Sequence, residues 1–133
     1  MRKNAPYAGC VYTKIPDIIG SVAKSARLYQ EKIGVAKVYV AHDRPCDAVF
    51  SCKYGNAFIE AKYNQNKLTP KQLKFGKSIT SLNHLFFVIR KRHLKQGITY
   101  YLEDAYRECL FKTDNIIQLI KAINNKIKEY TKG

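Results

Sequence analysis

Acidic residues are scarce in this chain and tryptophan is absent. Its 133 residues include 10 Asp and Glu against 24 Lys and Arg, which gives a formal net charge of +14. A surplus of this size favours a polyanionic partner, most often nucleic acid. No apolar run approaches the roughly 20 residues needed to span a bilayer, and no apolar region follows the basic start Met1–Asn4. We therefore expect no membrane association and an intracellular location, in the cytoplasm or, if the chain is viral, in the host cytoplasm.

Cysteine is also scarce, and its spacing does not suggest a metal site. No two of the four cysteines form a C-x-x-C pair; they are Cys10, Cys46, Cys52 and Cys109. A zinc site is therefore not expected, and the spacing disfavours an iron–sulfur cluster. Free thiols, mostly buried, are the expected state.

The length and the 46% content of hydrophobic residues predict one domain over residues 1–133. Helical periodicity predicts a helix from Pro16 to Ile33, a second from Pro70, and a last one that is capped by Thr113-Asp114 and carries an apolar stripe from Ile116 to Tyr130. Strands are predicted at 35–41, 48–50, 57–62, 85–89 and 98–102, while 104–112 is open between a short helix and a loop. This order predicts an α/β fold with a mixed central β-sheet flanked by helices.

Two neighbouring strands bring charged residues to one place. Asp47 opens the first strand, and Glu60 and Lys62 end the second, with Tyr54-Gly55-Asn56 expected as the turn between them. Because side chains alternate along a strand, Glu60 and Lys62 share a face, while Ile59 and Ala61 point to the other. Two carboxylates and the backbone carbonyl of Ala61 can hold a hard divalent ion such as Mg²⁺. A lysine beside that ion can orient or deprotonate an attacking water.

This ordered set resembles the PD-(D/E)xK nuclease superfamily, in which an acid on one strand is followed by acid-x-lysine on the next. Leu68–Gln72 is similar to the helix start, with a glutamine, that follows the ExK strand in VRR-nuc domains and in Holliday junction resolvases of archaea and phages. The resemblance covers residues 17 to about 103, although Cys46 stands where the superfamily has proline before the acid. It implies a restriction-endonuclease-like fold and Mg²⁺, with Mn²⁺ able to substitute. The catalytic set that it implies is Asp47, Glu60, Lys62 and Gln72, with Asp47, Glu60 and Ala61 holding the metal.

Basic residues close to this set are predicted to contact DNA phosphates without reading sequence. They are Lys67, Lys71 and Lys74 around the Pro70 helix, and Arg90, Lys91 and Arg92 in an expected loop after the apolar run 85–89. A solubilising loop is the simpler alternative for the second group.

Each site residue also has a simpler structural interpretation. Glu60 and Lys62 fit the solvated face of an edge strand, and Asp47 fits a turn residue, with Asp43 as a rival acid. Gln72 completes a capping box with Thr69, and this capping role is compatible with a catalytic role in the site.

These observations predict a magnesium-dependent DNA endonuclease, most similar to a structure-selective Holliday junction resolvase. Such an enzyme is expected to be a homodimer on branched DNA, with the Pro70 helix or the strand containing Tyr100-Tyr101 as the dimer surface. One alternative is a repair or degradative nuclease acting on flaps, ends or single strands. Another is a non-catalytic DNA-binding protein.

Overall fold

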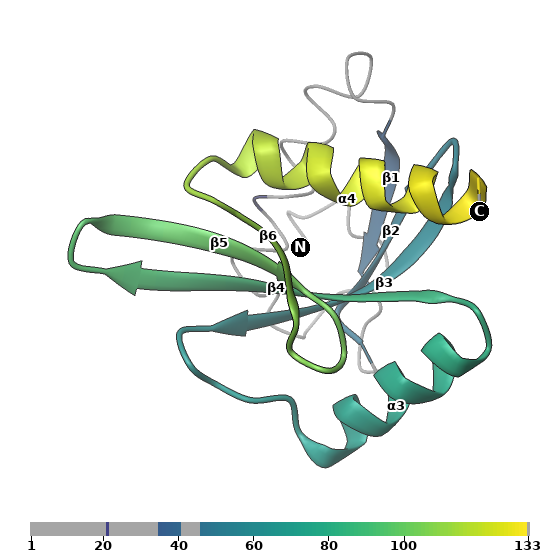
Figure 1. The fold of residues 1–133 in the computed structure, drawn as a ribbon, viewed down its shortest axis with the longest axis horizontal. Coiled ribbons are helices and arrows are strands. Elements are labelled where there is room, and N and C mark those ends of the chain that lie inside the picture. The colour runs from purple at the N-terminus through teal and green to yellow at the C-terminus, as the bar shows by residue number, and fades with distance from the viewer. Residues whose placement is uncertain (1–20, 22–34, 41–45, 133) are drawn as a thin grey trace, which may run out of the picture.

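The computed structural model describes residues 21, 35–40 and 46–132. These residues form a mixed sheet of six strands in sequential order, with one helix on each face (Figure 1). The strands are β1 (Val35–Val40), β2 (Ala48–Cys52), β3 (Gly55–Tyr63), β4 (Leu85–Leu94), β5 (Gly97–Glu103) and β6 (Cys109–Thr113), and the helices are α3 (Pro70–Ser81) and α4 (Ile116–Lys132). The predicted α/β class with a mixed, helix-flanked sheet is confirmed. Apart from residue 21, the helix predicted from Pro16 to Ile33 lies outside the described residues, and so does the rival acid Asp43.

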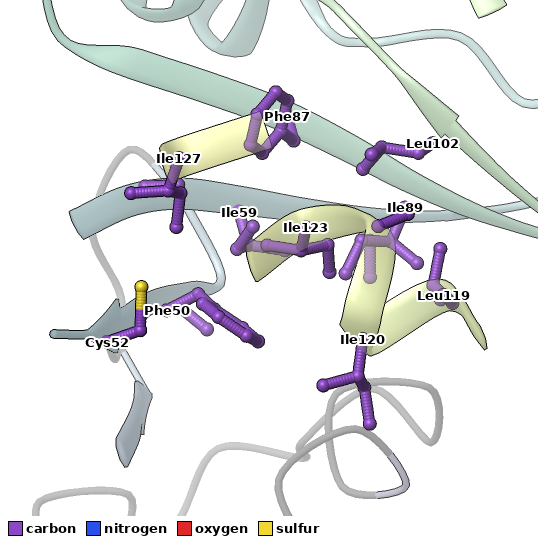
Figure 2. Close-up of a cluster of buried hydrophobic side chains, with 14 residues drawn as sticks. Phe50, Cys52, Ile59, Phe87, Ile89, Leu102, Leu119, Ile120, Ile123 and Ile127 are labelled. Atoms are coloured by element: carbon purple, nitrogen blue, oxygen red, sulfur yellow. The ribbon is translucent and has the colours of Figure 1, made fainter. Parts of the chain in front are cut away.

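Strands β3 and β4 are the only parallel pair in the described sheet, and α3 connects them. β4 is covered on both faces, as its unbroken apolar run predicts: Phe86 and Val88 pack toward α3, whereas Phe87 and Ile89 belong to the core beneath α4. Figure 2 shows the second core, where Ile120, Ile123 and Ile127 of α4 meet the sheet.

Helix α3 docks on its face of the sheet through aromatic rings and one glycine. The Phe75 ring lies edge-on to Phe58 and Phe86, with centroids 5.6 and 6.0 Å away. A Cβ atom at Gly76 would stand 2.7 Å from the Phe86 ring, so the close approach of helix and strand requires glycine at this position. The docking fixes the start of α3 relative to β3.

Three local predictions are wrong in detail. The β2–β3 turn consists of Lys53 and Tyr54, because Gly55, with a φ of 143°, already opens β3. The segment 104–112 contains part of strand β6, whose five residues are too few for a clear periodic pattern. Asn115, rather than Thr113-Asp114, caps α4, since its Oδ1 accepts from the amides of Ile117 and Gln118 at 2.8 and 3.2 Å.

Every helix in the described part of the chain lacks the length and apolar content needed to cross a bilayer.

Candidate active site

Asp47 lies beside Glu60 because the β2–β3 pairing continues one residue beyond β2. The Asp47 amide donates to the Ile59 carbonyl at 2.9 Å, and the Asp47 Oδ2 accepts from the Ala61 amide at 2.8 Å. The residue is thus bound through backbone and side chain to the ExK strand on both sides of Glu60. This geometry brings the two predicted carboxylates together.

Glu60 is buried, with 3% of its surface exposed, on the face of β3 that α3 covers. Burial is the largest cause that raises its pKa to about 9; the charge of Asp47 and a hydrogen bond between the two carboxyl groups raise it further, while Lys62 lowers it. Without a cation, Glu60 therefore retains its proton through neutral pH. The alternative that Glu60 lies on a solvated edge strand is wrong.

Gln72 joins the capping box to the carboxylate pair. Its Oε1 accepts from the Thr69 amide at 2.9 Å and its own amide donates to Thr69 Oγ1 at 3.2 Å, which completes the capping box. Its Nε2 donates to Glu60 Oε2 at 2.8 Å. Helix capping and contact with the site therefore coexist in one side chain.

Gln72→Glu separates these two roles, because glutamate also completes a capping box but has no Nε2 donor. We expect the midpoint of thermal unfolding at pH 5, where a buried carboxyl can stay protonated, to change by less than about 3 °C. At pH 8 a third carboxylate beside Glu60 adds negative charge at the cation site and should strengthen Mg²⁺ binding by at least about tenfold. Calorimetric titration of Mg²⁺ would measure the affinity, with Gln72→Ala as the variant that loses both roles. Wild-type Mg²⁺ affinity in Gln72→Glu would restrict Gln72 to capping.

The donor set suits Mg²⁺ better than a transition metal. The described residues contain no group of three or more His, Cys, Asp or Glu side chains that could enclose an ion. Magnesium commonly takes only one or two carboxylates, with waters and substrate phosphate as its other ligands. The carbonyl of Ala61 leaves β3 on the same edge as its amide, which faces Asp47. Asp47, Glu60 and this carbonyl therefore fit the magnesium site that the sequence predicts.

Arg90 is not part of a basic loop, because residues 85–94 form strand β4. Its side chain is buried, with 3% of the residue exposed, and its Nε donates to both carboxylate oxygens of Glu103 at 3.0 and 3.2 Å. Its Nη1 donates to the carbonyls of Asn64 and Asn66 at 2.9 and 2.6 Å. The prediction that Arg90 contacts DNA phosphate is therefore corrected: the residue is buried, and its Nε and Nη1 donors are engaged inside the protein.

The loop between β3 and α3 is fastened to β4 by this network. Besides the two bonds from Arg90, Asn64 donates its amide to the Lys91 carbonyl at 2.9 Å and accepts from the His93 amide at 3.0 Å. The loop carries Lys67 and ends at the Thr69 cap. Arg90, Glu103 and Asn64 thus hold the segment that brings Gln72 to Glu60, a role that our sequence analysis missed. Arg90 directly follows the unbroken apolar run 85–89 within the same strand, and this continuity is the signal that could have indicated its burial.

The other predicted phosphate contacts lie at the surface. Lys67, Lys71 and Lys74 are exposed around α3, while Lys62, Lys91 and Arg92 are half-buried. Arg92 stacks on Tyr101, with its guanidinium carbon 5.8 Å from the ring centroid. From residue 61 to residue 102 the chain has nine Lys and Arg and no acidic residue. The acidic residues immediately before and after this stretch, Glu60 and Glu103, are both buried.

The cysteines in the described part of the chain are free thiols: Cys46 and Cys52 are buried, whereas Cys109 is exposed. Burial, followed by the charge of the neighbouring Glu60, raises the pKa of the Cys46 thiol to about 11. Cys46 therefore stays neutral beside the carboxylate pair and does not act as a nucleophile at neutral pH.

Comparison of the chain with protein-family models, with curated proteins and with solved structures gives no match. The functional assignment accordingly rests on the residues and the geometry described above.

Proposed function

We propose that this protein is a magnesium-dependent DNA endonuclease with a restriction-endonuclease-like fold. The observation that carries the proposal is the carboxylate pair of half-buried Asp47 and buried Glu60; Gln72 binds Glu60, and Lys62 follows on the same strand face. Two carboxyl groups at hydrogen-bond distance in a partly buried place oppose ionisation and lower stability. A divalent cation removes this penalty, so the arrangement is suited to metal binding.

Each residue has a definite role in the proposed reaction. Asp47, Glu60 and the Ala61 carbonyl would hold the ion, and Gln72 keeps the Glu60 carboxylate oriented through its Nε2 donor. Mg²⁺ bound there would stabilise negative charge on the phosphate under attack and would lower the pKa of an attacking water. Lys62 orients that water and favours its deprotonated form for in-line attack on the phosphodiester.

The order β1-β2-β3-α3-β4, with β4 parallel to β3, supports the proposal as well. It places the acid, the ExK strand and the glutamine-bearing helix on consecutive elements, as the resemblance implies. The acid-free stretch 61–102 then surrounds the site with positive charge, which suits a phosphate backbone.

A cleavage assay tests the proposal directly. Purified protein would be incubated with radiolabelled junction, flap, duplex and single-stranded DNA in Mg²⁺, in Mn²⁺ and in chelator. We expect cuts in both metals and none in chelator, with loss of activity in Asp47→Asn and Lys62→Met. Lys53→Met, at the β2–β3 turn away from the site, is the matched lysine control. DNA binding without cleavage of any substrate would favour the non-catalytic alternative.

Junction resolution is the finer proposal. Exposed or half-buried lysines occur on both helices, with Lys71 and Lys74 on α3 and Lys121 and Lys128 on α4, so the basic surface is broader than one duplex groove. A symmetric dimer with two active sites can engage two strands of a four-way junction at once.

We therefore expect a dimer in solution that binds a four-way junction at least about tenfold tighter than a duplex of the same sequence, about 1.4 kcal/mol. Light scattering and gel-shift competition measure the two quantities. A monomer that prefers flaps or free ends would leave the nuclease proposal intact and refute the resolvase one.

A further inference from the structure

The β4–β5 hairpin extends beyond the rest of the sheet. Pairing of β4 with β3 ends at Tyr63↔Lys91, and pairing of β5 with β6 reaches only Tyr100↔Thr113. The strands β4 and β5 nevertheless stay paired to Leu94↔Gly97. Residues Arg92–Thr99 are therefore a two-stranded ribbon, and Figure 1 shows it reaching past both helices.

This ribbon contributes nothing to the described cores. None of its residues belongs to either cluster of buried side chains, and Ile98, at 38% exposure, faces solvent. A Cβ atom at Gly97 would meet nothing within 4 Å. A two-stranded hairpin without an apolar face is at best marginally stable in water, so its own packing does not explain its length.

The chemistry of the ribbon fits a polyanion. It contains Arg92, His93 and Lys95 and no acidic residue. His93 and Lys95 are exposed, and Arg92 is oriented by the Tyr101 ring rather than by an ion pair with any described carboxylate.

The ribbon also lies at the same end of the sheet as the candidate site. Because β3 and β4 are parallel, Lys62 pairs with Arg90, and Arg92 follows two residues later on the same strand face as Lys62. Beyond the last residue paired with β3, Lys91, three residues carry β4 to Leu94 at the tip, about 10 Å at the usual rise of a strand. This length is comparable with the depth of the DNA major groove, about 8.5 Å, and the groove is wide enough to admit a two-stranded β-ribbon.

We propose that the Arg92–Thr99 ribbon enters the major groove of a duplex arm whose backbone lies at the carboxylate site. The inference rests on the proposed function, in that it assumes DNA as the substrate, and it adds that the region beside the cut is double-stranded. Arg92 and Lys95 supply the contacts. Lys95 contacts a phosphate at the rim of the groove, and Arg92 contacts the DNA from the strand face that it shares with Lys62.

Two charge-matched double variants test the ribbon. Arg92→Ala/Lys95→Ala removes two charges from it, whereas Lys53→Ala/Arg107→Ala removes two exposed charges, again from one lysine and one arginine, elsewhere. Binding to a 30-base-pair duplex is measured in chelator, where no cleavage occurs, at several salt concentrations. We expect the ribbon variant to bind at least about tenfold more weakly, with a log–log salt slope reduced by about two units. We expect the control variant to stay within about threefold of wild type, because distant charges are screened. Equal losses in both variants, or none, would overturn the proposal.

Entry of the ribbon into the major groove can be measured separately from duplex binding. The N7 atom of guanine lies in the major groove, so bound protein should protect guanines beside the cut from methylation at N7. Lys95→Glu, a turn substitution that touches no core, should lose this protection while its thermal unfolding midpoint is unchanged. Duplex binding without N7 protection, or equal affinity for single strands, would refute groove entry.

The cleavage assay on wild-type protein keeps the two proposals apart. A wild type that does not cut, combined with a ribbon variant that loses duplex binding, would refute the nuclease and keep the ribbon. A wild type that cuts DNA, combined with equal duplex binding by the ribbon variant and the control variant, would keep the nuclease proposal and refute the ribbon proposal.

Discussion

Glu60→Gln is expected to abolish magnesium-dependent cleavage and to stabilise the metal-free protein at pH 8. The amide keeps the shape of the side chain, still accepts from Gln72 Nε2, and can donate to Asp47, but it cannot provide a charged ligand to Mg²⁺. Losing several kcal/mol of charge stabilisation in the transition state corresponds to a rate loss of about a thousandfold or more. A single-turnover assay on the DNA that wild type cuts measures this loss.

The gain in stability follows from the sign of the pKa shift of Glu60. Burial and Asp47 raise its pKa from 4.5 to about 9, so between these two values the folded state holds a proton that the unfolded state has released. The free energy of unfolding of the metal-free wild type must then fall as the pH rises through this window. Glu60→Gln has no such proton, and its contribution should not depend on pH.

Thermal unfolding in chelator from pH 5 to pH 9 tests this expectation. We expect the Glu60→Gln midpoint at pH 8 to exceed that of wild type by at least about 3 °C, with the difference shrinking toward pH 5. Mg²⁺ should raise the midpoint of wild type only. A variant that is less stable at every pH would show that the Glu60 carboxylate serves the fold and not an ion.

Arg90→Met is expected to destabilise the protein by about 3–5 kcal/mol, which is the usual cost of breaking a buried ion pair on one side. Glu103 is 7% exposed and would remain as an unpaired carboxylate, and the Asn64 and Asn66 carbonyls would lose their donors. Urea unfolding followed by circular dichroism measures the loss. Arg92→Met, on the same strand but half-buried over Tyr101, is the matched control and should cost about 0.5–1 kcal/mol.

The double variant Arg90→Met/Glu103→Met separates the ion pair from the loop. Replacing both charges by apolar side chains should recover most of the stability, because the desolvation penalty of each charge is removed together with their attraction. The two loop carbonyls stay without their donors, so the amides of residues 64–68 should exchange hydrogen faster than in wild type. We expect cleavage to remain low in the double variant. Recovered activity would show that Arg90 matters for stability alone.

Short-range patterns in the sequence predict much of the candidate site. Short apolar runs indicated the strand that Asp47 precedes and the strand that carries Glu60 and Lys62, and Thr69-Pro70 with Gln72 indicated the start of α3. The unbroken apolar run at 85–89 indicated a strand covered on both faces. These features depend on side-chain periodicity and on capping over a few residues, so neighbouring positions in the chain suffice to determine them.

Tertiary structure decided the contacts between segments that are distant in the chain. Arg90 looked like the start of a basic surface until the pairing of β4 with β5 brought Glu103 beside it. The proton on Glu60 depends on burial beneath α3 and on the approach of Asp47 from β2. Whether Gln72 serves only its helix depended on how closely Gly76 lets α3 approach β4. Burial and charge pairing are properties of the packed chain, and residue spacing alone does not determine them.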